Sequence, residues 1–489
     1  MVTNIYSNLK KIYIQLLSPL WLTTLISAML IVLLNIHTQD GSPLLYQGFL
    51  LQKYIYGDFA FFESTFKLAT TYTSWGGVVV SSILYKLAGI EQAERLMQLL
   101  HLLLFTKAVN NWSAYLKITN KLQWFWWLSM LLLFWSLTFT KGFYNYIYAL
   151  DLVLLVLPNL LEIDPLNKKK LICISVMLFL SFVFHPLPFM FALLVLLLNY
   201  NKKNSNNNYL YLLPSMLLLI CHFMHIHSAT NYIGYSIVSR IGDLVKGVFL
   251  ASYLRSEFVF SGVLVCINLS VLVVVFFKSK NKYNIYIKIL FAVLVLYLFS
   301  PQETSGGGLI GIRLAWLMLF FSLVYIVQNI SLYKKHLIYV YINCSITLCF
   351  ILYKAFIVFE YNNSYVYACF ENIEGKVYRL YNNTNIMQKN GWLFPVYPYQ
   401  FQKKYINNNL VNFQNHFANS DYYPFTYKNS CFIEEKWSEE NKNKVIKDGC
   451  DYLVTDSIIA DTNFEFYCSQ NRSNNEFQYY IYKLKHANR

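Results

Sequence analysis

Asp40 is the first residue whose type and place suggest chemistry. It lies in the stretch QDGSPLLYQGF, a few residues after an apolar run that ends near Ile36. A carboxylate where a chain leaves a membrane can serve as a general base toward an acceptor that approaches from water. The plain alternative is a turn residue or a helix N-cap, because Asp favours both positions. Asp58 and Glu63 follow in the same loop and are less specific, because most loop carboxylates are solvated.

Asp151 is a second candidate, because it lies inside the apolar stretch YNYIYALDLVLLVLP. An ionised carboxylate in such a segment is costly and usually faces a cavity or a partner. The alternative is a buried, hydrogen-bonded aspartate near the membrane interface. Asn145 precedes it in the turn GFYNY, where it is either a helix cap or a ligand for sugar hydroxyls.

Arg313 lies five residues beyond the glycine run of SGGGLIGIR and within an apolar segment, where a guanidinium needs a partner. Its forked donors fit the oxygens of a phosphate group. A purely structural pairing with Glu303 or Asp151 is the alternative. The glycine run is not a phosphate-binding loop, because it lacks the lysine and the preceding strand of that motif.

Three histidines near an apolar segment raise the question of a metal. His222 and His225 are three residues apart and share a helix face, and His227 follows them. Imidazole is a common ligand of transition metals. No positioned carboxylate accompanies the group, so the favoured interpretation is interfacial histidines without a metal.

The composition indicates which elements must position these residues. The 489-residue chain is 56% hydrophobic and 13% charged, and its mean hydropathy is +0.37. These values indicate a polytopic membrane protein. The net charge of +15 does not indicate nucleic-acid binding, because the lysines cluster between apolar runs, as the positive-inside rule describes. The clusters are Lys10–Lys11, Lys168–Lys170, Lys202–Lys203, Lys278–Lys282 and Lys334–Lys335.

Placing these lysine clusters in the cytoplasm predicts an all-α bundle of about 11 transmembrane helices. The first apolar run is long and lacks a cleavage site, so we interpret it as an uncleaved first span. The segment 37–75 is then an outer loop with interfacial helices, and 76–90 is a re-entrant or interfacial stretch. The predicted spans are about 19–36, 96–113, 122–140, 143–163, two within 170–200, 209–227, 257–277, 285–300, 308–328 and 336–358.

The two predicted spans within 170–200 depend on the sequence HPLP, because proline disfavours helix at the residue before it. We expect two short helices that meet outside at His185–Pro188, with one long kinked helix as the alternative.

The chain changes character at about residue 360. Residues 1–359 form the predicted membrane domain, and 360–489 form a small extracytoplasmic α/β domain. Strand-like CDYLVTDS and FQYYIYKLK flank helix-compatible EEKWSEENKNKVIKDG, in which Gly449 suits a helix stop. Four cysteines in this part allow two disulfides in three connectivities: Cys369, Cys431, Cys450 and Cys468.

The order of these features resembles the polyprenol-phosphate-sugar-dependent GT-C superfamily of membrane glycosyltransferases, and within it an uncharacterised bacterial group with a first motif of the type DGPxHxYN. The resemblance covers about residues 19 to 330. Two positions depart from the group: Leu44 stands where it carries His, and Gln47 where it carries Asn. The matching residues are Asp40–Gly41 with Tyr46, Ser74–Trp75, Ala93–Glu94–Arg95, Gly142–Asn145, His185, and Gly306–Gly308 before Arg313–Leu314.

This resemblance implies inverting transfer of a sugar from a polyprenyl-phosphate donor to a glycan, lipid or protein acceptor on the outer leaflet of the plasma (inner) membrane. Asp40 would be the base and Arg313 would bind the departing phosphate. Asp151, Asn145 and His185 would orient sugar or acceptor, and Tyr46, Trp75 and Glu303 complete the predicted substrate site. Some members of the superfamily use a divalent metal, and the sequence leaves that open.

Two other functions remain open at this point. The replacement of the expected histidine by Leu44 raises the alternative of a non-catalytic, degenerate family member. A transporter or flippase for lipid-linked sugars is the other alternative, although such proteins tend to contain two related halves with broken helices. No internal repeat is evident in this sequence.

Overall fold

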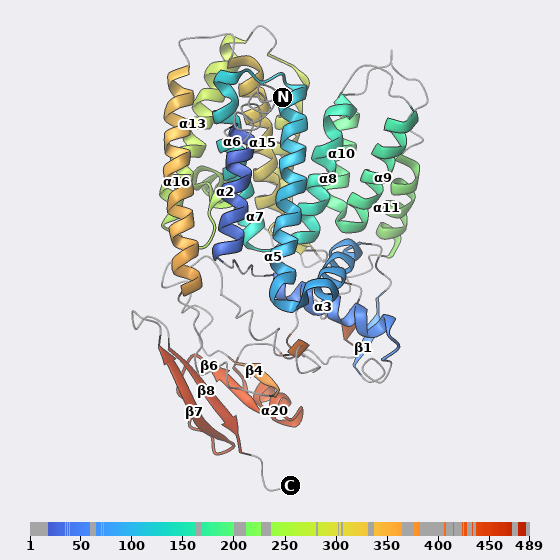
Figure 1. Ribbon diagram of the computed structural model, residues 1–489, viewed down its shortest axis with the longest axis vertical. Coiled ribbons are helices and arrows are strands. Elements are labelled where there is room, and N and C mark those ends of the chain that lie inside the picture. Colours follow the sequence, from blue (N-terminus) through green and yellow to red (C-terminus); the bar gives the residue numbers. More distant parts are fainter. Residues whose placement is uncertain are drawn as a thin grey trace, which may run out of the picture.

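The structure is a computed structural model, and it consists of a helical bundle with a small sheet at one end (Figure 1). The residues that the structure describes are 18–34, 36, 38, 40–58, 65–69, 71, 73–161, 168–199, 212–225, 236–279, 282–301, 303–304, 307–330, 337–363, 375–380, 405–406, 414, 423, 425–427, 433, 437–471 and 478–485.

A helix lies at each of the predicted spans. Among the described residues, five segments are long and apolar enough to cross a membrane, and the protein is therefore membrane-embedded. These are Asn120–Thr140, Tyr144–Leu161, Glu257–Lys278, Ile310–Ile330 and Ile338–Phe359. The total of about 11 crossings stays a prediction. The bundle helices are α2 (Pro19–Leu34), α5 (Trp75–Tyr115), α6 (Asn120–Phe134), α8 (Tyr144–Leu161), α9 (Lys168–Phe184), α10 (Pro186–Leu198), α11 (Leu213–His225), α13 (Glu257–Lys278), α14 (Ile285–Phe299), α15 (Ile310–Ile330) and α16 (Leu337–Asn363).

The core of the bundle is formed by helices that are apolar on all sides. Helices α8 and α15 are buried along nearly their whole length, whereas α13 and α16 expose one side. A helix without a polar face is stable only inside a bundle or against lipid. Helices α9 and α10 are separate, with His185 between them as the N-cap of α10. The proline-rich stretch therefore ends one helix and starts another, as expected.

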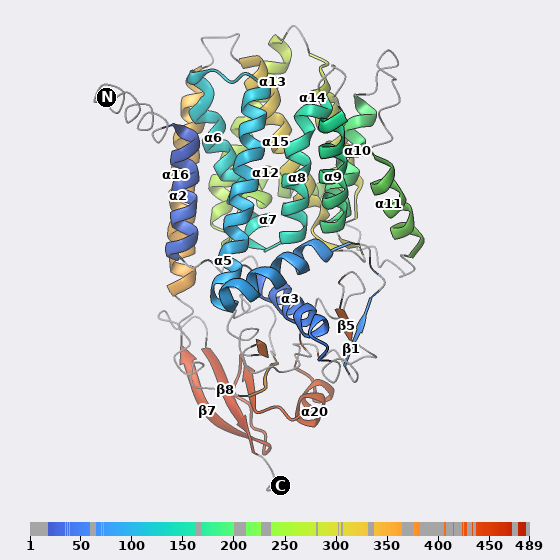
Figure 2. The same ribbon diagram turned by 45° about the vertical axis from the view of Figure 1, so that its right-hand side comes forward.

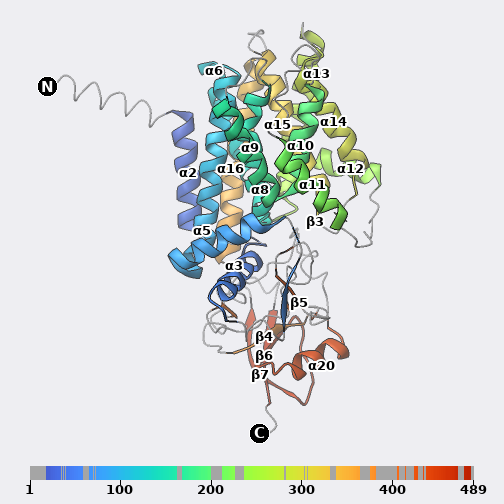
Figure 3. The same ribbon diagram turned by 90° about the vertical axis from the view of Figure 1, so that its right-hand side faces the viewer.

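Two helical segments lie across the end of the bundle that faces the C-terminal sheet, which we call the domain end (Figures 1 and 2). They are α3 (Gly41–Ile55) and the first part of α5. Helix α5 bends at Gly89, whose φ of +72° is unlike that of a helix, and then runs through the bundle (Figure 3). The stretch 76–90 therefore lies across the bundle end, in the position expected of an interfacial segment.

One helix was not expected from the sequence. Helix α12 (Ile237–Lys246) is short and amphipathic, with Val238 and Ile241 exposed on its apolar side. Ser236 caps its start and Gly247, at φ +62°, ends it. The 3₁₀ turn η3 (Val248–Leu250) follows and leads to α13. The short helix α7 (Leu137–Thr140) continues α6 at the domain end.

The C-terminal part contains a four-stranded sheet in the order β4-β6-β8-β7. Strands β4 (Val377–Arg379) and β6 (Tyr452–Thr455) are parallel, and β8 (Gln478–Leu484) is antiparallel to both β6 and β7 (Phe464–Asn471). Helix α20 (Glu439–Lys447) packs on the sheet through Val445, and Gly449 follows it at φ +73°. The strands and the helix expected in this part are therefore present.

Of the four cysteines in this part, Cys450 alone has a described side chain. Cys450 is a free thiol in the interior of the C-terminal sheet, where its sulfur lies 3.1 Å from the carbonyl oxygen of Tyr452. Two disulfides that use all four cysteines are therefore not formed, because Cys450 is free. Cys369 and Cys431 lie outside the described residues.

A short strand from the far end of the chain docks on the domain end. Strand β5 (Phe425–Tyr427) pairs antiparallel with β1 (Phe66–Leu68). The side chain of Gln47, on α3, donates to the carbonyl of Phe425 at 2.9 Å and accepts from its N–H at 3.2 Å. The polar atoms of this buried amide are therefore satisfied by backbone, as a strand neighbour would satisfy them.

Helix α16 is fixed to the bundle by a buried ion pair. The Nζ of Lys354 lies 3.0 Å from Oε2 of Glu257, and both side chains are almost fully buried. Glu257 also accepts hydrogen bonds from the backbone N–H groups of Ser252, Tyr253 and Leu254. The charge of Glu257 is thus well compensated, so the loop before α13 is held in one conformation.

Replacing Lys354 with Met should destabilise the protein strongly, because it leaves Glu257 charged and without its counter-ion. The expected loss is on the order of 3 kcal/mol, measured as a lowered midpoint of thermal unfolding in detergent. Lys53→Met is the matched control, since Lys53 pairs with Asp58 at 3.0 Å in a partly exposed place and should cost less than about 1 kcal/mol. Equal midpoints for both variants would contradict the role given to the buried pair.

Candidate functional site

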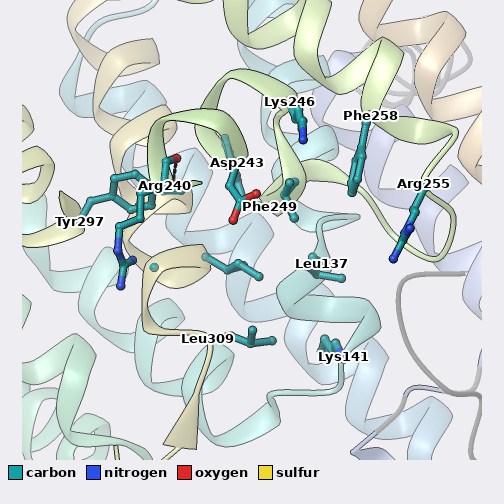
Figure 4. Close-up of a pocket in the computed structure, with 14 residues that line it drawn as sticks. Leu137, Lys141, Arg240, Asp243, Lys246, Phe249, Arg255, Phe258, Tyr297 and Leu309 are labelled. Carbon is teal, nitrogen blue, oxygen red and sulfur yellow. Dashed lines mark hydrogen bonds between the residues drawn. The ribbon is translucent and has the colours of Figure 1, made fainter. Parts of the chain in front are cut away.

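A basic pocket of about 520 Å³ lies at the domain end, between α12, α15 and the end of α7 (Figure 4). Four cationic residues line it, and one acid, Asp243, stands among them. The four are Lys141, Arg240, Lys246 and Arg255. Figure 4 shows Arg240 and Arg255 on opposite sides of the pocket, with Lys246 and Lys141 between them. Such an excess of positive charge within a concave, partly apolar wall favours an anionic ligand.

Arg240 is the most rigidly held of these cations. It is only 3% exposed, its guanidinium donates to the carbonyl oxygen of Ser300, and its central carbon lies 5.6 Å from the ring centre of Tyr297. The Tyr297 hydroxyl in turn donates to the Arg240 carbonyl at 2.6 Å. The guanidinium packs directly on Gly311, where a Cβ would collide with Nη1. The glycine next to the start of α15 thus makes room for this arginine.

Lys141 brings the second held cation from another part of the chain. It follows α7 directly, and its carbonyl oxygen accepts a hydrogen bond from the backbone N–H of Asp40 at 2.9 Å. Burial lowers the pKa of the Lys141 ammonium to about 8, and the negative charge of Asp40 acts in the opposite direction. A bound anion would favour the charged lysine further.

Asp40 stands beside this pocket without lining it. It occupies the N-cap position of α3, yet its side chain makes no capping hydrogen bond. The capping explanation for this carboxylate is therefore not supported. Asp40 and Lys141 are close to each other, because their backbones are hydrogen-bonded. Asp40 is also half-buried, so it borders both protein and solvent.

The contact between Asp40 and Lys141 depends on two glycines and a buried glutamate. A Cβ on Gly142, which has φ +75°, would collide with the Thr38 hydroxyl and lie 2.9 Å from the backbone nitrogen of Gly41. Glu94, on α5, accepts from the N–H and the hydroxyl of Thr38 at 2.9 and 2.6 Å. The turn after α7 can approach the start of α3 this closely because Gly142 has no Cβ, whereas Gly41 makes room for Glu94 and Thr38.

Arg313 belongs to a cluster next to the pocket. Its Nη1 lies 3.0 Å from Nε2 of His185, and its guanidinium stacks over the rings of Phe143 at 4.5 Å and Tyr146 at 5.0 Å. The predicted arginine, histidine and GFYN turn are therefore brought together. Arg313 is not among the residues that line the basic pocket, although its neighbours Gly311 and Ile312 are. Of its two predicted structural partners, Asp151 pairs with His101 instead, and the side chain of Glu303 lies outside the described residues.

Asp151 pairs with a residue that the sequence did not single out. Its Oδ2 lies 2.6 Å from Nδ1 of His101, and both side chains are buried in the bundle. The imidazole stacks on Phe134 at a centroid distance of 4.7 Å. His101 follows Glu94 by seven residues, so both lie on one face of α5. The seven-residue spacing from Glu94 was the available sequence signal for His101. No sequence signal indicated its partner, because Asp151 is 50 residues away.

The other predicted substrate ligands have structural partners. The Oδ1 of Asn145 accepts from the N–H of Gly77 at 2.8 Å, which caps the start of α5 and favours the cap interpretation. Tyr46 is fully buried beside Phe49. The indole N–H of Trp75 donates to the Thr71 carbonyl at 3.0 Å. None of these side chains lines the basic pocket.

The histidines do not form a metal site in the part of the chain that the structure describes. His222 is buried with its ring edge-on to Phe182. The side chains of His225 and His227 lie outside the described residues. Among the described residues, no three His, Cys, Asp or Glu side chains are grouped as metal ligands would be.

An apolar groove adjoins the basic pocket. It has a volume of about 650 Å³, lies between α13, α14 and α15, and shares Phe249 and Ala315 with the pocket. Its α13 wall runs from Val265 to Phe276, which corresponds to about 16 Å at 1.5 Å per residue. Roughly half of a 30 Å hydrocarbon core is therefore matched by this wall.

Comparison with protein-family models, with curated proteins and with solved structures finds no match for this chain.

Replacing Gly142 with Ala should lower the thermal stability and disturb the site for two reasons. The new methyl group collides with Thr38 and Gly41, and alanine is strained in the left-handed backbone conformation of this position. The matched control is Gly89→Ala, since Gly89 has a similar φ of +72° and nothing within 4 Å of the added carbon. The control should cost only the backbone strain of about 1–2 kcal/mol. The close packing would be disproved if both variants unfolded at the same temperature.

Proposed function

We propose that the protein is a membrane glycosyltransferase that moves a sugar from a polyprenyl-phosphate donor to an acceptor outside the cytoplasm. The observation that carries this proposal is the basic pocket that continues into an apolar groove. A lipid with a phosphate headgroup presents the same two surfaces, a charged end and a long apolar chain. The resemblance of the motif order to the GT-C superfamily supports the same donor class.

The fit of the donor follows from the lining residues. Arg240 and Lys141 offer charge-assisted hydrogen bonds to the phosphate oxygens. The isoprenoid chain would lie against Leu269, Leu272 and Leu294 in the groove, where burial of apolar surface is favourable. Phe249 lines both spaces and marks the passage from headgroup to chain.

The chemistry that we propose is an inverting displacement at the anomeric carbon. Asp40 takes the proton of the acceptor hydroxyl while the acceptor oxygen forms its bond to the anomeric carbon. The bond between that carbon and the phosphate oxygen breaks, and the phosphate leaves with the electron pair. Lys141 and Arg240 stabilise the charge that develops on it.

Arg313 and His185 then have a positioning role in this proposal. The guanidinium stacks on Phe143, two residues after Lys141. It therefore helps to hold the turn that presents Lys141 to the pocket and Asp40 to the acceptor. Asn145 holds the start of α5 against the same turn.

The orientation in the membrane is part of the proposal. Lys168–Lys170 open α9 and Lys278 ends α13, both at the end of the bundle opposite the C-terminal sheet (Figure 1). The positive-inside rule assigns that end to the cytoplasm. The basic pocket, Asp40 and the C-terminal sheet then face the outer side of the plasma membrane.

Asp40→Asn should reduce formation of the glycan product by about 10²-fold or more, because a general base typically contributes that much. The measurement compares envelope glycans and accumulated lipid-linked sugars in cells that carry wild type, variant or deletion. Asp58→Asn serves as control, since Asp58 forms a partly exposed pair with Lys53. Undiminished product from Asp40→Asn would remove Asp40 from the mechanism. Translocation of lipid-linked sugar in vesicles without any transfer would favour a flippase instead.

Binding of a polyprenyl phosphate should weaken as the pH rises through 8. Below that value Lys141 is protonated, and above it the ammonium loses the charge that attracts the phosphate. The dissociation constant of farnesyl phosphate is measured between pH 7 and 9.5, where the charge of the phosphate itself is constant, since its second pKa is about 6. Lys141→Arg should make the affinity independent of pH in this range. A pH profile that is unchanged by this substitution would contradict the assignment of Lys141.

A further inference from the structure

We propose that α12 lies within the membrane leaflet at the domain end, with its apolar face against lipid acyl chains and its charged face toward the protein. The inference depends neither on the proposed sugar donor nor on which side of the membrane the domain end faces. It rests on the pattern of exposure along α12, on its contacts with the ends of two neighbouring helices, and on the apolar surface that continues beside it.

The pattern of exposure on α12 is the reverse of that of a surface helix in water. Such a helix buries its apolar side and exposes its polar side. On α12, Val238 is 80% exposed, and Ile241 and Val245 are exposed on the same side. The charged residues of α12 all line the basic pocket instead (Figure 4): Arg240, Asp243 and Lys246. This reversed arrangement is favourable where the surroundings of the helix are apolar.

Contacts near both ends of α12 define its depth in the bundle. In its first half, Arg240 donates to the carbonyl oxygen of Ser300, which directly follows α14. At its last residue, the carbonyl oxygen of Lys246 accepts from the hydroxyl of Ser261, one turn after the start of α13, at 2.8 Å. The end of α14 and the start of α13 both lie at the domain end. Helix α12 therefore runs across the bundle at the level where these two helices end and begin.

This level is the one at which interfacial helices lie in a membrane. The apolar face of such a helix enters the boundary between headgroups and acyl chains by about 5–10 Å. Helix α12 has ten residues. A helix of that length is about 15 Å long, whereas the hydrocarbon core is about 30 Å thick, so α12 lies within one leaflet and does not cross the membrane.

The apolar surface of α12 continues onto its neighbours in the bundle. Helix α12 packs on α13 and α14, and Figure 3 shows it at the outer edge of the bundle. Near the same level, Val259 and Val263 on α13 and Phe299 on α14 are also exposed. Helix α13 is long and apolar enough to cross a membrane, so its exposed valines face lipid. Acyl chains that cover α13 and α14 there also cover the apolar side of α12.

The hydrogen bonds of α12 run to the protein, as an apolar medium requires of a helix that it surrounds. The hydroxyl of Tyr297 donates to the carbonyl oxygen of Arg240 at 2.6 Å, and the guanidinium of Arg240 packs on Gly311. The side chain of Ser236 accepts from the N–H of Ser239 at 3.1 Å and so caps the start of the helix. Helix α12 thus separates the basic pocket from the acyl chains by the thickness of one helix.

The test uses the full-length protein in phosphatidylcholine vesicles with a photoreactive side chain, and lipid adducts are measured by mass spectrometry after irradiation. Val238→p-benzoylphenylalanine and Ile241→p-benzoylphenylalanine probe α12 at two positions, so that one variant that fails to fold does not end the test. Val263→p-benzoylphenylalanine, on α13, is the control that faces lipid. Ile458→p-benzoylphenylalanine, exposed between β6 and β7 of the C-terminal sheet, is the control that faces water. Thermal unfolding midpoints show which variants are folded.

The folded α12 variants should form lipid adducts with a yield within about twofold of the Val263 variant and about tenfold above the Ile458 variant, because their side chains enter the acyl chains. A yield no higher than that of the Ile458 variant would overturn the proposal, since α12 would then face water. Cross-links between two copies of the protein at these positions would overturn it as well, because a second copy would then cover this face. Neither of these results would bear on the proposed function.

Discussion

The close contact between the turn after α7 and the start of α3 is the constraint on which the site depends. The backbone N–H of Asp40 bonds to the carbonyl oxygen of Lys141, and Gly142 allows the two backbones to touch, while Gly41 makes room for Thr38 and Glu94. This single contact ties the candidate acid to a cation of the basic pocket. Glu94 supports it from α5 by binding Thr38. Interactions from three segments of the chain therefore converge on a few backbone atoms.

Three charged side chains buried in the bundle are each paired with a partner. Glu257 has Lys354, Asp151 has His101, and Arg313 has His185 with two aromatic rings. Each charged group in an apolar surrounding needs such a partner, because desolvation without compensation is costly. The basic pocket is different, because four cations and the acid Asp243 line an open cavity there. That contrast is the physical reason for assigning ligand binding to the pocket rather than to the buried pairs.

The sequence predicted the helices well where apolar runs were long, since length and hydropathy alone decide whether a segment can be buried in a membrane. It also predicted that the GFYN turn, His185 and Arg313 belong together. It missed Arg240, Lys246 and Arg255, because short polar segments resemble solvated loops. The spacing of Arg240, Asp243 and Lys246 opposite Val238, Ile241 and Val245 was a signal for an amphipathic helix. That Lys141 meets this helix follows only from the tertiary fold, as does the pairing of Asp151 with His101.

The hydrogen bonds between Gln47 and Phe425 have a consequence for folding during synthesis of the protein. The two residues are 378 positions apart, and the glutamine recognises main chain rather than a side chain. During synthesis, the side-chain amide of Gln47 on α3 lacks its partner until almost the whole polypeptide has been made. Water on the aqueous side can satisfy that amide in the meantime, so β5 can dock after the bundle has been inserted. The docked strand is then also held by its side chains, because Phe425 packs against Tyr54 and Trp75.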